Sequence, residues 1–298
     1  MIDNKNMSYV LISAVKNEEK YIHHPLESVM SQTCTPLRWV IVSDGSEDGT
    51  DDILRKYQER CDFLQFIRRD AIKENIGFMS KVFALRQGYE TLREVEYNFI
   101  GILDGDISFD PTYYENILTE FGKNKKLGIS GGYIYEPDKN GVYRRRTHNR
   151  VRSVAGAVQM YRRECYEMIG GLQPIIYGGE DTYAEIVARI NNWEVQAFPE
   201  YKVFHHKPGY EKRGVWKERF REGRLDYVLG YRTIYELLKL IRRIPEYPYF
   251  CGAFVRIIGY VWAFMTGEDK IPPPEILIHI KKEQWDILRK AYGGNNKN

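Results

Sequence analysis

Short apolar runs alternate with amphipathic stretches along the first 120 or so residues of the chain. Buried strands are predicted at 9–14, 37–42, 63–67 and 99–103, and helices at 21–31, 50–60, 77–92 and 111–121. Strands that alternate with helices predict an α/β fold, a mostly parallel sheet with helices on both faces. Ligands bind such sheets at the carboxyl ends of the strands. The residues that follow each apolar run are therefore the first candidates for a binding site.

The pattern continues less regularly towards the C-terminus. We expect strands at 127–135, 194–198 and 202–206. A short helix is expected at 164–169, a longer helix at 182–190, and a polar, basic loop at 136–149. After about residue 214 the pattern becomes helical and amphipathic. We therefore predict an α/β domain at 1–224 and a helical C-terminal extension at 225–298.

Two acids follow the apolar run at 99–103. Asp104 and Asp106 are separated by Gly105, so on a continuing strand both side chains would point to the same side. Converging carboxylates repel each other unless a cation lies between them, and oxygen ligands suit Mg²⁺ or Mn²⁺, which also bind substrate phosphates. The triplet predicts a metal site for a diphosphate, although such triplets also occur in solvated turns.

Other polar residues at strand and helix ends each allow two interpretations. Asp44 is either a turn-forming residue or an acceptor for a nucleobase N–H. Asp181, which follows Gly179 and Glu180, is either a helix N-cap or a general base that takes a proton from an acceptor hydroxyl. Lys81, in the helix after Asn75 and Gly77, is a phosphate contact or a surface lysine.

His205 and His206 end the strand predicted at 202–206. Neighbouring residues on a strand point to opposite faces, so the two rings cannot easily reach one metal ion. A lone histidine is more often a hydrogen-bonding residue than a ligand. If one of them completes an Asp/His metal site, we expect it to be His205.

Composition limits the class of protein. The chain has 298 residues, 43% of them hydrophobic, and 44 basic against 41 acidic residues, a net charge of +3. This balance gives no case for a nucleic-acid partner. The four cysteines (Cys34, Cys61, Cys165 and Cys251) form no Cys-x-x-Cys pair, and the N-terminus lacks a signal-peptide pattern, so we expect reduced thiols and a cytoplasmic location.

An apolar, aromatic stretch at 249–267 is interrupted by Arg256. A membrane-spanning helix needs about 20 largely uncharged residues, so this stretch is marginal as a span. It could instead lie on the inner surface of a membrane, or pack on the catalytic domain or in a homodimer contact. The pattern favours neither alternative.

Taken together, these segments resemble the inverting glycosyltransferases of family 2, which have the GT-A fold. The similar segments, in the family's order, are 10–19, 42–50, Asn75-x-Gly77, Asp104-Gly105-Asp106, 160–163 with 169–171, Gly179-Glu180-Asp181 and 203–205. The chain departs from the family at Ser43, which replaces the first acid of an Asp-Asp-Gly-Ser motif, so only Asp44 inherits the base-contacting role.

The resemblance implies a nucleotide-diphosphate sugar donor, with a UDP-sugar favoured, and a Mn²⁺ or Mg²⁺ ion held by Asp106 and His205. It implies that Asp181 is the catalytic base of an inverting transfer. The implied donor-nucleotide contacts are Ala14, Asn17, Glu18, Asp44, Asn75, Gly77, Lys81, Asp104 and Gly105, and the implied acceptor-side residues are Gly156, Arg162, Gly179 and Glu180. Basic segments and the aromatic C-terminal stretch favour a glycan or lipid-linked glycan acceptor.

Two other functions remain open at this stage. A nucleotidyltransferase that makes nucleotide sugars would show a glycine-rich loop after its first strand, and residues 15–19 contain no glycine. A non-catalytic protein that binds nucleotide sugars or glycans is the other alternative. The presence of both Asp106 and Asp181 counts against it.

Overall fold

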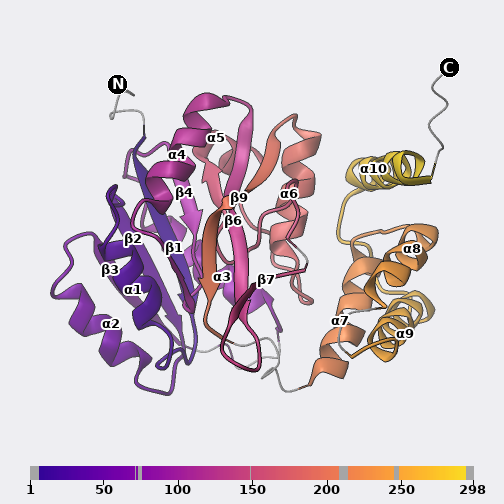
Figure 1. Cartoon of the computed structure of the whole chain (residues 1–298), viewed down its shortest axis with the longest axis horizontal. Helices are drawn as coiled ribbons and strands as arrows, with labels where there is room; N and C mark the ends of the chain where they lie inside the picture. The colour runs from indigo at the N-terminus through magenta and orange to yellow at the C-terminus, as the bar shows by residue number, and fades with distance from the viewer. Residues whose placement is uncertain are drawn as a thin grey trace. The chain divides into compact units, whose positions relative to one another are not determined.

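The computed structural model describes residues 7–70, 72, 76–147, 149–207, 214–244 and 248–292 (Figure 1). Two compact units divide the chain. The first comprises Met1–Ile176 with Glu180–Glu211, and the second comprises Tyr177–Gly179 with Lys212–Asn298. The second unit takes in the whole of helix α7 (Val215–Val228), and the boundary expected at 224/225 falls inside that helix.

The first unit is a nine-stranded sheet with helices on both faces (Figure 1). Its strands are β1 (Tyr9–Val15), β2 (Arg38–Asp44), β3 (Leu64–Arg69), β4 (Phe99–Ile102), β5 (Ile107–Phe109), β6 (Leu127–Pro137), β7 (Tyr143–Arg145), β8 (Met160–Arg162) and β9 (Glu194–His205). Its helices are α1 (His23–Met30), α2 (Thr50–Gln58), α3 (Met79–Glu90), α4 (Tyr113–Lys123), α5 (Arg163–Met168) and α6 (Glu180–Ile190). Strands β1 to β4 and helices α1 to α4 agree closely with the predicted elements of the first 120 residues, whereas β5 and β8 were not predicted.

The strand order is β3-β2-β1-β4-β8-β6-β9-β5, with β7 paired to β6. Strands β1 to β4 pair only in parallel with one another, as the alternating pattern predicts. The other half of the sheet is mixed: β8 is antiparallel to β4 and β6, β9 is parallel to β6, and β5 is antiparallel to β9. After β4, in the middle of the sheet, the chain turns at Asp104–Asp106 and enters β5, the edge strand that pairs with β9.

Two details of the predicted β structure were wrong. The segment expected to be a loop at 136–149 contains the end of β6 and the strand β7, which form an antiparallel hairpin. Asp138 stabilises its turn, because its carboxylate accepts backbone N–H groups of Asn140 and Val142 at 2.9 and 3.0 Å. The two short strands expected at 194–198 and 202–206 are the single strand β9, whose pairing with β6 shifts register between Gly132 and Tyr133.

The core of the first unit lies on the sheet and is rich in aromatic residues. Trp39 and Tyr9 are almost fully buried, and Trp39 donates a hydrogen bond to Ser13 at 3.0 Å. The Tyr9 hydroxyl donates to the backbone oxygen of Cys34 at 2.6 Å, which satisfies its polar end inside the core. This packing holds β1 and β2 rigidly, and both strands end at the candidate site.

The second unit contains α7, α8 (Thr233–Arg243), α9 (Cys251–Met265) and α10 (Pro274–Tyr292). Helices α7 and α9 pack closely at two glycines: a Cβ at Gly223 would overlap the backbone oxygen of Arg256, and a Cβ at Gly259 would overlap that of Phe220. None of the helices in the described ranges combines the length and hydropathy needed to cross a bilayer.

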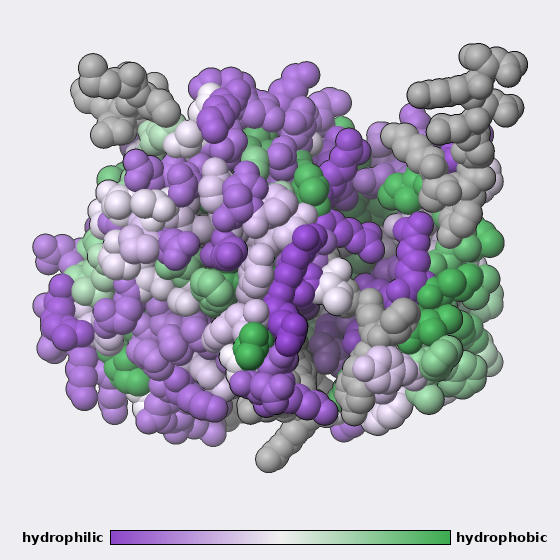
Figure 2. All heavy atoms as spheres, in the orientation of Figure 1, coloured by the Kyte–Doolittle hydropathy of each residue, from purple (hydrophilic) through white to green (hydrophobic). Residues whose placement is uncertain are grey.

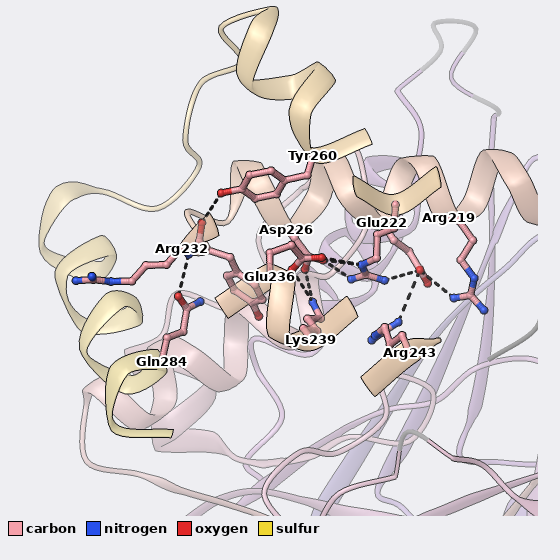
Figure 3. A network of polar contacts seen from close by, with 11 residues as sticks. Arg219, Glu222, Asp226, Arg232, Glu236, Lys239, Arg243, Tyr260 and Gln284 are labelled. Atoms are coloured by element: carbon pink, nitrogen blue, oxygen red, sulfur yellow. Dashed lines mark hydrogen bonds and ion pairs between the residues drawn. The ribbon is translucent and has the colours of Figure 1, made fainter. Parts of the chain in front are cut away.

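A buried network of ion pairs lies between these helices (Figure 3). The Arg256 guanidinium donates to Asp226 at 2.9 Å and to Glu236 at 3.1 Å. Lys239 adds a bond of 2.6 Å to Asp226. Burial by itself would raise the pKa of Asp226, but Arg256 and Lys239 outweigh it and hold that pKa well below its usual range. The network therefore determines which face of α9 points inward.

We expect Gly223→Ala to lower the unfolding free energy of the second unit by about 1–3 kcal/mol, because α7 and α9 must separate to admit the methyl group. Guanidinium denaturation of the variant and the parent checks this. Gly252→Ala, also in a helix of this unit, is the control: its Cβ would lie 3.1 Å from Pro248 Cδ, a side-chain atom that need give way by only a few tenths of an ångström, whereas the Cβ at Gly223 meets backbone. Equal stability of the two variants would contradict the packing described here.

Candidate active site

The candidate site lies at one edge of the sheet, where parallel strands end. β1, β2 and β4 are neighbours, so their carboxyl ends meet at the same edge. Ala14 pairs with Val42 near these ends, and Asp44 is the last residue of β2. Asp104 follows β4 by two residues. The fold therefore brings these predicted donor-binding residues to one edge.

The loops after β1 and β2 are joined by hydrogen bonds. Asn17, in the left-handed conformation with φ 54°, accepts the backbone N–H of Glu47 at 2.8 Å through its side chain. The backbone N–H of Glu18 donates to Thr50 Oγ1 at 2.8 Å. Ser43, the residue that departs from the family pattern, bonds Ser46 at 2.8 Å. The side chain of Asn17 thus binds the neighbouring loop and holds the end of β2 in place.

Asp44 is buried and is held from two sides. Its Oδ2 accepts a hydrogen bond from Ser80, and its Oδ1 lies 3.6 Å from Arg69 Nε. That Oδ1 is buried and accepts no hydrogen bond within the described part of the chain. A buried carboxylate oxygen without a hydrogen-bond donor is costly, so it suits a ligand N–H. Asn75, predicted to contact the same nucleotide, lies outside the described residues.

Lys81 connects two distant parts of the site. Gly77, with φ 54°, precedes α3 at a place where a Cβ would meet the backbone oxygen of Ile176. One turn into α3, Lys81 Nζ lies 2.7 Å from Asp104 Oδ1 and 3.8 Å from Glu180 Oε1. Burial alone would lower the pKa of Lys81, but Asp104 and Glu180 raise it above its usual value. The ammonium group is therefore charged, and it is paired with carboxylates.

Asp106 and His205 lie together on the other side of Gly105. Asp106 Oδ2 is 3.1 Å from His205 Nε2, because Ile107 pairs with His205 across β5 and β9. Burial by itself would raise the pKa of Asp106, but the hydrogen bond from His205 lowers it overall. Burial would lower the pKa of His205, but hydrogen bonds with Asp106 and Glu136 raise it to about 9. Asp104 and Asp106 thus have different cationic partners.

The Asp106 and His205 side chains have the spacing of two ligands of one divalent ion. Two neighbouring ligands of an octahedral ion with bonds of about 2.1 Å lie about 3 Å apart, close to the separation found here. Within the described ranges no set of three or more His, Cys, Asp and Glu side chains is arranged to hold a metal. Mg²⁺ and Mn²⁺ commonly use one or two protein ligands and fill the remaining positions with phosphate and water.

The neighbouring His206 has a different role. Its ring stacks on His24 at a centroid distance of 3.5 Å. Its two ring nitrogens lie 2.7 Å from the hydroxyls of Ser108 and Tyr143. Both nitrogens are therefore engaged within the protein, which supports His205 as the metal-ligand candidate.

Asp181 lies in the first turn of α6, not before it, so its carboxylate does not cap the helix from the N-cap position. Its Oδ2 accepts the backbone N–H of Gly156 at 3.2 Å. A Cβ at Gly156 would lie 2.7 Å from the same oxygen, so this contact requires glycine. Glu180 is buried, which raises its pKa although Lys81 lies close. Gly179 adopts φ 83°, a conformation that favours glycine.

Arg162, which the resemblance implies to be an acceptor-side residue, binds backbone oxygens of the protein instead. Its guanidinium donates hydrogen bonds to the backbone oxygens of Phe121, Leu127 and Asn124 at 3.0, 3.2 and 3.3 Å. It also lies over the ring of Phe99. The polar atoms of Arg162 therefore hold β8 to the end of α4, and we leave this residue out of the proposed acceptor site.

Sequence reasoning missed several residues of the site. Lys207 binds Glu18 at 2.7 Å. Glu185 lies one turn after Asp181 in α6, and its Oε1 accepts the backbone N–H of Val154 at 2.6 Å. Glu185 and Asp181 thus hold the same loop, 153–156, against α6. Their i, i+4 spacing is visible in the sequence, but the loop they bind is not.

Comparisons with known proteins agree with this arrangement. A family profile described as Glycosyl transferase family 2 matches residues 10–179. Poly-beta-1,6-N-acetyl-D-glucosamine synthase of Staphylococcus aureus (strain COL) is 23% identical over 277 residues, which cover 85% of this chain and 62% of that protein. The chain thus spans less than two thirds of the length of this relative.

Solved structures show the same fold. Mannosyltransferase PcManGT from Pyrobaculum calidifontis, in complex with GDP-Man and Mn²⁺, has a TM-score of 0.55 at 15% identity, covering 96% of this chain and 76% of that one. S. aureus TarS 1-349 in complex with UDP has a TM-score of 0.52 at 16% identity, covering 72% of this chain and 64% of that one. At these identities the likeness concerns the fold, which is that of the GT-A glycosyltransferases.

The buried Glu185 predicts a pH-dependent stability. Burial raises its pKa to about 8. The contribution of Glu185 to the unfolding free energy is therefore complete below the pKa of a glutamate in the unfolded chain, about 4.3, and is lost as pH rises through about 8. Between these values the unfolding free energy should fall by up to ~1.4 kcal/mol per pH unit.

Glu185→Gln keeps the acceptor oxygen and removes the titration, so we expect it to flatten this slope. Chemical denaturation between about pH 5 and about pH 8 measures the difference from the parent. Glu164→Gln, at an exposed position of α5, should retain the parent slope. If Glu185→Gln follows the parent at every pH, the buried acid is not the source of the dependence.

Proposed function

The chain belongs to glycosyl transferase family 2 and is a glycosyltransferase, and on this premise we propose a specific reaction for it. A sugar passes from a nucleotide-diphosphate donor, with a UDP-sugar favoured, to a hydroxyl of a glycan or lipid-linked glycan. Asp181 is the general base, a divalent ion is required, and the anomeric configuration inverts.

The contact of Lys81 with Asp104 and Glu180 carries this proposal. Asp104 belongs to the segment proposed to bind the donor, and Glu180 precedes the proposed base. One partly buried ammonium, 2.7 Å from the first and 3.8 Å from the second, joins the two segments. A donor sugar bound at Asp104 would therefore lie beside the helix that begins with Glu180 and Asp181.

Asp44 is the proposed contact for the nucleobase. Its buried Oδ1 has no hydrogen-bond donor in the described part of the chain and can accept an imide N–H such as that of uracil. The UDP in the TarS structure is consistent with this choice, whereas the GDP-Man of the Pyrobaculum calidifontis enzyme shows that the fold accepts other nucleotides. We propose that Ala14, Glu18, Gly77 and Gly105 complete the donor site.

Asp106 and His205 are the proposed ligands of Mn²⁺ or Mg²⁺. The ion supplies positive charge beside the leaving diphosphate when it is bound. Mn²⁺ is present in the structure of the Pyrobaculum calidifontis mannosyltransferase. Burial by itself would raise the pKa of Asp106, but its contact with His205 lowers that pKa and keeps the carboxylate ionised.

Asp181 is the proposed base. It takes the proton of the acceptor hydroxyl as the oxygen forms its bond to the anomeric carbon, while the bond from that carbon to the diphosphate oxygen breaks. The N–H of Gly156 orients the carboxylate through Oδ2. Gly156, Gly179 and Glu180 lie around this carboxylate in sequence or in space, and we propose that they form the acceptor side.

Asp181→Asn should lower the rate of transfer, or of donor hydrolysis with water as acceptor, by about 10²–10⁴-fold, because the amide cannot take the proton. Binding of the nucleotide sugar should change little, since Asp181 is not among the proposed donor contacts. Release of the nucleotide diphosphate and calorimetric titration with the donor measure the two quantities. Asp52→Asn, exposed on α2, is the matched control, and transfer by Asp181→Asn at the parent rate would eliminate Asp181 as the base.

Asp106→Asn should remove most of the increase in UDP affinity that Mn²⁺ produces in the parent. The carboxamide retains the size of the side chain but loses the charge that binds the ion. Titration of UDP with and without Mn²⁺ tests this for both proteins. An unchanged Mn²⁺ effect in the variant would contradict the assignment of Asp106, and Asp52→Asn should retain the full effect.

A further inference from the structure

Helix α9 exposes only apolar side chains. Phe254, Ile258, Val261 and Met265 follow the spacing i, i+4, i+7 and i+11 and therefore form one stripe along the helix. All of them are exposed, Phe254 by 64% and Met265 by 77%. Soluble surfaces usually carry charged residues on the outward face of a helix, so this stripe needs an explanation.

The apolar surface extends beyond α9. Tyr249 and Phe250, immediately before the helix, are exposed by 63% and 70%. Helix α8, which packs against α9, exposes a second stripe formed by Ile234, Leu237 and Ile241. Figure 2 shows hydrophobic side chains gathered over the part of the second unit that α8 and α9 occupy. We call the exposed apolar residues of 249–265 and of α8 the apolar face.

The apolar face cannot turn inward. The opposite side of α9 carries Arg256, whose guanidinium is buried between Asp226 and Glu236. It also carries Gly259, where α7 approaches too closely for any larger residue. Rotation of α9 would remove the guanidinium and leave the buried carboxylates of Asp226 and Glu236 with Lys239 alone, which is destabilising. The outward position of the apolar residues is therefore built into the packing of the unit.

Positive charge accompanies the apolar face. Residues 212–298 contain 17 Lys and Arg against 10 Asp and Glu, a net charge of +7, whereas the whole chain carries +3. At the start of α9 a small hollow of about 10 Å³, room for about one water molecule, is lined by Arg219, Arg243, Gly252, Ala253 and Arg256. The three guanidinium groups share the carboxylate of Glu222. Arginine presents a planar fork of donors that matches phosphate oxygens.

We propose that the apolar face is a docking surface for a bilayer that contains anionic phospholipids. Its side chains enter the boundary between headgroups and acyl chains, and the basic residues of the unit, Arg219 and Arg243 among them, attract the anionic headgroups. Tyr249 and Trp262 are residue types that favour this boundary. A two-fold contact between copies would bring the same basic surface against itself, which favours the anionic bilayer as the occupant.

Flotation of the full chain with vesicles tests the proposal, and it does not depend on the proposed transfer reaction. The chain should float with vesicles of phosphatidylcholine containing about 30% phosphatidylglycerol, and less with phosphatidylcholine alone. The double variant Phe254→Ser and Met265→Ser should lose binding by about tenfold or more. Met168→Ser, which removes a similarly exposed methionine of α5, is the matched control and should bind as the parent does.

A second pair of substitutions tests the arginines beside the apolar face. Arg219→Gln combined with Arg243→Gln should weaken binding to the anionic vesicles and leave the weak binding to phosphatidylcholine unchanged. Inorganic phosphate at millimolar concentration should neither compete with the vesicles nor raise the melting temperature of the chain. If it does both, Arg219 and Arg243 belong to a site for free phosphate and the lipid assignment is overturned. Thermal unfolding and donor binding of each variant show that the fold is retained.

Two results would overturn the docking surface itself. The first is failure of the parent chain to float with anionic vesicles more than it does with none. The second is a dimer, measured by light scattering, that the double serine variant dissociates while vesicle binding is absent in the parent. The second result would identify another copy of the chain as the occupant of the apolar face.

Discussion

The partly buried ammonium group of Lys81 neutralises a site in which acidic side chains predominate. It lies between Asp104 and Glu180, and Asp181 follows directly. The Lys81 and Asp104 side chains are 27% and 29% exposed, so loss of the ammonium leaves the carboxylates uncompensated at a smaller cost than in a fully buried pair. The end of β4, the start of α3 and the start of α6 therefore depend on this one side chain for their common arrangement.

The compensation is incomplete. Burial raises the pKa of Glu18, and the nearby carboxylates of Asp106 and Asp104 add to that effect, although Lys207 opposes it. Burial likewise raises the pKa of Glu180 against the influence of Lys81. Two acids near the same edge of the sheet are thus less easily ionised than usual. A further cation near Asp106 and His205 would relieve this cluster, which is consistent with the divalent ion proposed for the reaction.

The second unit follows the same physical rule with a different result. Arg256 interrupts an apolar helix, and its burial among acids determines the rotation of α9 about its axis. The apolar residues on the other side of the helix are consequently exposed. The ion pairs of Arg256 thereby expose the apolar residues of α9, because the side of a helix opposite its buried side faces the solvent.

The local part of this structure could be read from the chain alone. Apolar runs predicted β1 to β4, the intervening helices and the strand ends that carry Asp44 and Asp104, because the periodicity of side chains depends on neighbours in sequence. The order of the motifs along the chain indicated the family, because motif order is also a property of the sequence alone. The hairpin of β6 and β7 was missed, because its basic and polar residues resemble those of a loop until Asp138 closes the turn.

Only the tertiary structure decided which side chains meet. Asp104 and Asp106 are two residues apart, yet the first pairs with Lys81 on α3 and the second with His205 on β9. Arg162 lies in a motif of the family but binds backbone oxygens of a distant segment. The apolar stretch at 249–265 is plain in the sequence, whereas the face it exposes depends on where Asp226 and Glu236 lie. These contacts join residues far apart along the chain, and no local pattern records them.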